Sequence, residues 1–179
     1  MSLVLYTPPV INHVVAHRVH IAGVVDRTLY IGQHGKGTGK ILWPAAELLS
    51  GFVAEPSSNA VLSTAVGSSL GHWSWEGKNV VELGSGLGLL ATTLLLLGST
   101  VVATDGEATV VKQLNTNILA NKEVVLGDRG VLMYSGMVYE WGSDVSLLTD
   151  RLDGIYSEIR AQPAIKLTHP AQQQVRLMS

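Results

Sequence analysis

The chain has no cysteine among its 179 residues. This absence excludes a disulfide framework, a cysteine-bound zinc site and a catalytic thiol. Charged residues of either sign are scarce as well, because they make up only 15% of the chain. The 12 Lys and Arg and 14 Asp and Glu leave a net charge of -2. A domain that binds duplex nucleic acid needs clustered Lys and Arg, so nothing in the composition points to DNA as a partner.

A long hydrophobic run is missing too. The most apolar stretch covers residues 87–97, is flanked by glycines, and is shorter than the roughly 18 residues that a membrane span requires. Residues 1–6 are apolar, but no basic region precedes them and Pro8 and Pro9 soon follow, which is not typical of a signal peptide. With 46% hydrophobic residues the chain can bury the core of one domain. We therefore expect a soluble, cytoplasmic or nuclear protein without a membrane partner.

The first forty residues and the rest of the chain differ in pattern. Alternating apolar residues over 14–31 predict a β-hairpin, which a glycine-rich turn over 32–39 connects to a helix over 41–52. Residues 56–71 are small and polar and are compatible with another short helix. From residue 79, short apolar runs alternate with helical segments, which predicts a parallel sheet with right-handed crossovers. The predicted elements are strands over 79–83, 100–104, 131–139 and 152–156, and helices over 89–97, 107–121 and 143–148.

A glycine-rich loop separates the first of these strands from its helix. Glu82, Gly84, Gly86 and Gly88 alternate with other residues, and glycine lets a ligand come close to the main chain. The spacing differs from the dinucleotide fingerprint, in which the third glycine stands three positions after the second. Asp105 ends the next strand, where an acid can accept hydrogen bonds from ribose hydroxyls. A nicotinamide cofactor remains an alternative for the loop, and a helix N-cap remains one for Asp105.

The acid inside the strand and the loop that follows it resemble motif I of the class I methyltransferases, which bind S-adenosylmethionine. Further motifs occur in one order along the chain: Leu-Trp-Pro-Ala-Ala at 42–46, Val-Glu-Leu-Gly-Ser-Gly-Leu-Gly-Leu at 81–89, Thr104-Asp105, Asn117, Asn121 and Trp141-Gly142. In this set the chain resembles the seven-β-strand protein-lysine methyltransferases of methyltransferase-like family 16 over residues 39–156. All class I methyltransferases share the glycine loop, whereas the Trp-Pro and Trp-Gly elements are more specific.

This resemblance implies a Rossmann-like class I α/β sheet, S-adenosylmethionine as cofactor, no metal, and a protein with a target lysine as acceptor. The cofactor-binding residues that it implies are Trp43, Glu82, Gly84, Ser85, Gly86, Asp105 and Trp141. Trp43 would border the cofactor and Trp141 would lie against the adenine, although each tryptophan is also compatible with core packing.

The family also carries an Asp-x-x-Tyr element beside the channel for the lysine. Asp153 and Tyr156 have that spelling, so the resemblance implies that they are catalytic residues. Asp153 would orient the amine and Tyr156 would line the channel. In the alternative interpretation, Asp153 is only the acid that starts the fourth strand.

The second half of a doubly wound sheet is not evident after residue 159, where prolines and glutamines follow. We therefore expect an N-terminal hairpin extension over 1–40, an incomplete S-adenosylmethionine-binding domain over 41–159 and an irregular tail over 160–179. A truncated form of the family would have an uncovered sheet edge and poor catalysis. Two other functions stay open: a methyltransferase that acts on a small molecule or RNA, and a non-catalytic remnant that binds only cofactor or a partner.

Two weaker motifs are not favoured. A phosphate loop requires Ser or Thr directly after its lysine, and Ile41 follows Lys40. His13, His17 and His20 lie in an alternating, strand-like segment without an accompanying carboxylate, so they do not predict a metal site.

Overall fold

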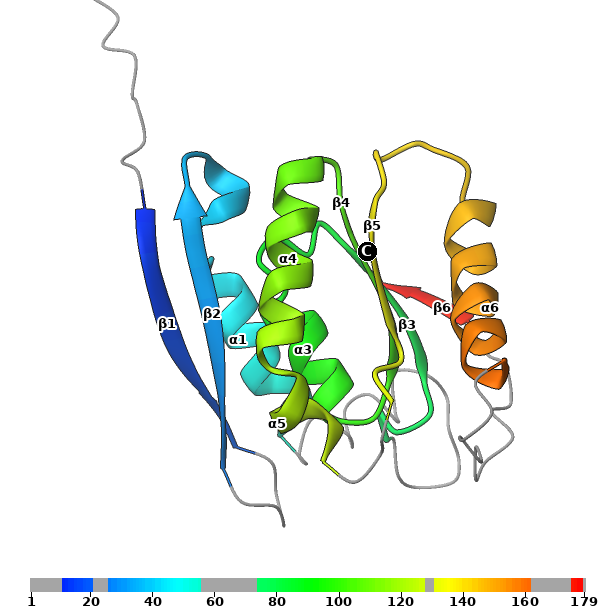
Figure 1. Ribbon diagram of the computed structural model, residues 1–179, viewed down its shortest axis with the longest axis horizontal. Coiled ribbons are helices and arrows are strands. Elements are labelled where there is room, and N and C mark those ends of the chain that lie inside the picture. Colours follow the sequence, from blue (N-terminus) through cyan, green and yellow to red (C-terminus); the bar gives the residue numbers. More distant parts are fainter. Residues whose placement is uncertain (1–10, 21–25, 56–73, 128–130, 162–174, 179) are drawn as a thin grey trace, which may run out of the picture.

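The computed structural model describes residues 11–20, 26–55, 74–127, 131–161 and 175–178 (Figure 1). Two sheets are formed. One is an antiparallel pair of strands. The other is a parallel sheet with the strand order β5 (Tyr134–Val138), β4 (Thr100–Asp105), β3 (Asn79–Leu83) and β6 (Val175–Met178). The helix predicted over residues 56–71 lies outside the described residues. Within the described ranges, no helix is both long enough and apolar enough to cross a membrane.

The N-terminal hairpin is confirmed. Strands β1 (Ile11–Val19) and β2 (Arg27–Gly35) pair antiparallel, and buried Leu29 and Ile31 alternate with exposed Tyr30. The predicted start of the glycine-rich turn, at residue 32, was wrong, because β2 continues through Gly35. A Cβ atom at Gly32 would lie 3.1 Å from Oδ1 of Asn117, so a side chain there would press on that asparagine.

Two asparagine side chains, Asn117 in helix α4 (Ala108–Ala120) and Asn121 directly after it, fasten this hairpin to that helix. Asn117 donates from Nδ2 to the Gly32 carbonyl and accepts the Gly32 N–H at Oδ1, at 3.1 and 2.9 Å. Asn121 makes the same pair of bonds with Tyr30, both at 2.8 Å. Asn117 also donates to the carbonyl of Leu87 at 2.9 Å. The hairpin is therefore tied to the part of the chain that carries the glycine loop.

The parallel sheet lies between two layers of helices. Successive strand residues face opposite sides, so Val80 and Val101 pack with helices α1, α3 and α4, whereas Val81 and Val102 pack with helix α6. Figure 1 shows the hairpin and helices α1, α3 and α4 on one side of the sheet and α6 on the other. The remaining elements are η1 (Thr38–Lys40), α1 (Pro44–Ala54), α3 (Leu89–Leu96), α5 (Lys122–Leu126) and α6 (Ser146–Arg160).

Most predicted elements are confirmed within a few residues, but the fourth strand was wrong. Residues 146–160 form the single helix α6, which covers the predicted short helix 143–148 only in part and replaces the strand 152–156. The buried side chains of this segment are Leu148, Leu152, Ile155 and Ile159. Their spacing of four, three and four residues puts them on one face of a helix, where they contact the sheet.

The prediction of an irregular tail over 160–179 was also wrong at its end. Val175–Met178 form strand β6, which pairs in parallel with β3 and has Val175 opposite Asn79. Strand β3 is therefore paired along both edges, with β4 on one side and β6 on the other.

Candidate functional site

Residues 84–88 connect the carboxyl end of β3 to the start of α3. The loop needs glycine, because Gly84, Gly86 and Gly88 have positive φ angles of 72°, 51° and 83°. Ser85 fixes its position by donating its N–H to the carbonyl of Thr104 at 2.7 Å and by accepting the Thr104 N–H at Oγ at 3.1 Å. The loop is thus held between the ends of β3 and β4, where parallel α/β sheets bind ligands.

A cavity of about 640 Å³ lies against this loop. Its walls come from the segment that leads into α1, from β3 and the loop, and from α3; among them are Leu42, Trp43, Ala46, Leu49, Glu82, Gly84, Ser85, Gly86 and Leu90. The lining is mostly apolar with a few polar groups at one end, which is typical of a small-molecule site.

Glu82 brings a buried carboxylate to this cavity. Its Oε2 atom is buried and has no hydrogen-bond partner among the described residues. Burial raises the pKa of Glu82 to about 7, although hydrogen bonding with the Ser85 side chain and the Ala91 backbone acts to lower it. A carboxylate in this position favours a ligand with a positive charge or a hydrogen-bond donor.

Asp105 lies next to the loop at the end of β4. Its Oδ2 accepts the N–H of Gly86 at 3.3 Å, and its Oδ1 accepts the N–H of Glu107 at 3.1 Å. Helix α4 begins at Ala108 with Glu107 at the N-cap position, so the N-cap alternative for Asp105 was wrong. Each carboxylate oxygen makes one of these hydrogen bonds and keeps further acceptor capacity for a ligand.

Two tryptophans border the same region. A Cβ atom placed on Gly84 would lie 3.6 Å from Cζ2 of Trp141, and Trp141 is 79% exposed. Trp43 lines the cavity, is 54% exposed, and donates from Nε1 to the carbonyl of Thr38 at 2.8 Å. Neither tryptophan is core filling, so this alternative was wrong for both. Trp75, in contrast, is buried.

The sequence interpretation missed one residue near the site. Gln33 is buried and accepts the N–H of Leu42 at Oε1 at 2.8 Å, which positions the chain before Trp43. Gln33 follows Leu29 and Ile31 at the two-residue spacing of one strand face, and this spacing could have predicted that its side chain is buried. Lys40 contacts Glu107 at 3.5 Å between Nζ and Oε1, beside Asp105 in sequence.

The structure does not bring Asp153 and Tyr156 to the cavity. The hydroxyl of Tyr156 donates to Oδ1 of Asn79 at 2.5 Å and lies 3.0 Å from Oγ1 of Thr100. These residues begin β3 and β4, so Tyr156 lies at the end of the sheet opposite the glycine loop. The catalytic role predicted for this pair is therefore not supported.

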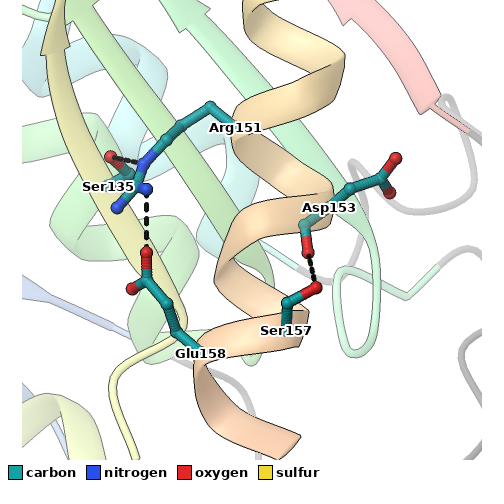
Figure 2. A network of polar contacts seen from close by, with 5 residues as sticks. All are labelled: Ser135, Arg151, Asp153, Ser157 and Glu158. Carbon is teal, nitrogen blue, oxygen red and sulfur yellow. Dashed lines mark hydrogen bonds and ion pairs between the residues drawn. The ribbon is translucent and has the colours of Figure 1, made fainter. Parts of the chain in front are cut away.

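Asp153 is exposed on α6 (Figure 2). Its main-chain carbonyl accepts a hydrogen bond from Ser157, and its carboxylate points away from Arg151. Arg151 instead bonds Ser135 of β5 at 2.6 Å and Glu158 at 2.9 Å. Within the described part of the chain, no group of three or more His, Asp or Glu side chains could hold a metal ion.

Comparison with models of protein families adds an independent finding. The model described as lysine methyltransferase matches residues 25–155. The match begins just before β2, leaves out β1, ends within α6, and includes the glycine loop, Glu82, Asp105 and both exposed tryptophans. It covers well over half of the chain and confirms the resemblance found in the motifs. The chain therefore belongs to the lysine methyltransferase family.

Proposed function

We propose that the chain transfers a methyl group from S-adenosylmethionine to the side-chain amine of a lysine in a protein. The observation that carries this proposal is that the buried oxygen of Glu82 and the glycine loop line one cavity, and that Asp105 is bonded to Gly86 of that loop. Membership of the family supports both the reaction and the class of acceptor.

The residues present suit the chemical groups of this cofactor. The unpartnered oxygen of Glu82 suits the positively charged methionine end, and Asp105 has acceptor capacity for two ribose hydroxyls. The exposed ring of Trp141, beside Gly84, offers a flat apolar surface to the adenine, and Trp43 borders the cavity from the side of α1.

When bound, S-adenosylmethionine supplies an electrophilic methyl group on a sulfonium. The task of the chain is then to orient an amine in line with that group and to exclude water. The amine must lose its proton before it can react, and an apolar surrounding favours its neutral form. Among the described residues we assign no catalytic base, because Asp153 and Tyr156 lie away from the cavity.

Gly86→Ala tests the proposed cofactor site. A Cβ atom at Gly86 meets only the carbonyl of Gly39 at 3.9 Å, so the folded chain has room for the added methyl group. A ligand bound close to the loop would collide with that methyl group. Gly77→Ala is the matched control, because Gly77 also has a positive φ, of 69°, with no atom within 4 Å of the added Cβ. Both variants should lose about 1 kcal/mol of stability.

In titration calorimetry with S-adenosylmethionine, only Gly86→Ala should lose affinity, by at least about tenfold. Undetectable binding by the unmodified chain would refute the cofactor assignment. Incubation with methyl-labelled S-adenosylmethionine and separate protein, RNA and metabolite fractions then identifies the acceptor. Label on protein lysines is the expected result; label on RNA or metabolites, or cofactor binding without transfer, would contradict the proposed reaction.

A further inference from the structure

The segment that joins β5 to α6 exposes large apolar side chains beside the glycine loop. Val145, just before α6, and Leu147, in its first turn, are 47% and 49% exposed, and the exposed Trp141 of the same connection lies next to Gly84. Figure 1 shows this connection at the same edge of the sheet as the end of β4, where α4 begins. The exposed side chains therefore lie at the functional end of the sheet, outside the cavity.

This segment is held in place by its own hydrogen bonds. Tyr139 donates its N–H to the carbonyl of Asp105 at 3.0 Å and its hydroxyl to the carbonyl of Ser143 at 2.8 Å. Ser143 in turn donates to the carbonyl of Glu140 at 3.0 Å. Because the buried ring of Tyr139 and these bonds fix the backbone, the neighbouring apolar side chains are presented to solvent in a fixed arrangement.

The charges on the same segment all have one sign. Residues 131–150 contain Glu140, Asp144 and Asp150 and no Lys or Arg. The nearest cation in sequence, Arg151, is engaged by Ser135 and Glu158 and does not point toward Asp153 or the start of the helix (Figure 2). An exposed apolar surface with an acidic border complements a segment that carries both apolar and basic side chains.

We infer that the β5–α6 surface, formed by Glu140, Asp144, Val145 and Leu147, docks the acceptor protein through a basic segment that contains apolar side chains and flanks the target lysine. This inference rests on the proposed function, because it identifies where the acceptor protein binds relative to the cavity beside the glycine loop. The acidic border also disfavours RNA, whose phosphates it would repel.

Binding of two labelled peptides tests this surface without requiring methyl transfer. In one fluorescein-labelled peptide, arginine and leucine flank a central lysine; in the other, glutamate replaces each arginine. Fluorescence polarisation with the full chain should detect binding of the arginine peptide, and the affinity should fall as salt is added. Equal binding of the two peptides would overturn the inference.

Two variants with matched controls locate the binding. Glu140→Lys should lower the affinity for the arginine peptide by about fivefold or more at low salt, and Asp153→Lys, at an exposed acid farther along α6 and outside this surface, should not. Leu147→Ser should lower it by about threefold, whereas Leu119→Ser, at a similarly exposed leucine of α4, should not. Equal losses in a variant and its control would overturn the assignment to this surface.

Calorimetry with S-adenosylmethionine on the same variants separates the two proposals. Unchanged cofactor affinity in Glu140→Lys and Leu147→Ser, with weakened peptide binding, supports the docking surface. Peptide selectivity in a chain that binds no cofactor would also support the surface while refuting the proposed function.

Discussion

The buried carboxylate of Glu82 makes the stability of the chain depend on pH. Its Oε2 atom has no hydrogen-bond partner among the described residues, and burial raises its pKa to about 7. In the unfolded chain the same group has the ordinary pKa of 4.5. The folded state therefore binds a proton at Glu82 more tightly than the unfolded state does, and the charged carboxylate is the destabilising form.

The sign and size of the effect follow from these two values. Between pH 4.5 and about 7 the folded state holds more protons than the unfolded state, so the free energy of unfolding falls as the pH rises. Above pH 7 both states are ionised at this position and the contribution is constant. Each pH unit is worth about 1.4 kcal/mol, so the whole interval corresponds to about 3 kcal/mol.

Glu82→Gln isolates this contribution, because the amide has nearly the same shape and does not titrate. Urea unfolding of the chain without ligand, at several values between about pH 4.5 and pH 8, gives the free energy of unfolding for both proteins. The difference between wild type and Glu82→Gln should change by about 3 kcal/mol across that range, in favour of the variant at high pH. Glu76→Gln, which removes an exposed carboxylate, should keep the wild-type slope. Parallel profiles for wild type and Glu82→Gln would refute the assigned burial and charge.

Three further substitutions test the other polar contacts. Asp105→Ala should lower the affinity for S-adenosylmethionine by at least about tenfold in calorimetry, and unchanged affinity of the folded fraction would contradict a role in cofactor binding. Asn117→Ala leaves two main-chain groups of β2 without their partner and should cost about 3 kcal/mol in urea unfolding; Thr116→Ala, on the exposed side of α4, should cost much less. Tyr156→Phe removes the hydroxyl bonded to Asn79 and should cost about 1 kcal/mol with cofactor affinity unchanged, whereas a tenfold loss of that affinity would place Tyr156 at the site after all.

The part of the fold that the sequence predicted best is the part with the most regular burial. Strand β3 has the predicted bounds, and α3 and β4 differ from theirs by one residue. Continuous apolar runs, closed by Gly98 and by the glycine loop, are typical of strands and helices that are covered on both faces. The loop glycines and Asp105 belong to this same unit, so their meeting at one edge followed from the parallel arrangement.

Helix α6 could have been predicted but was not. The short run from Leu152 to Tyr156 has a strand-like composition, and the Asp-x-x-Tyr spelling strengthened that interpretation. The four-, three- and four-residue spacing of Leu148, Leu152, Ile155 and Ile159 is the competing signal, and packing on the sheet decided in its favour. Strand β6 had no such signal, because four residues after a polar segment form a strand only where β3 offers an edge.

The contact between Gln33 and Leu42 and the two asparagine contacts to β2 could not be inferred from local pattern. Gln33 and Leu42 are nine residues apart, across the turn after β2, whereas the asparagine contacts join distant segments; Asn117 and Gly32, for example, are 85 residues apart. A single sequence shows a polar residue in a strand or on a helix, but not the main-chain group that it binds.

Asn117 and Asn121, at the C-terminal end of α4, have a consequence for the outer edge of the hairpin. Residues four apart on a helix are about 6 Å apart along its axis, and residues two apart on a strand are separated by nearly the same distance. Asn117 and Asn121 therefore match the repeat of Gly32 and Tyr30 and saturate the main-chain groups that point away from β1. The two asparagine amides thus make the hydrogen bonds that the main chain of a neighbouring strand would otherwise make. At these two positions, β2 offers no free template to a second copy of the chain or to a misaligned strand.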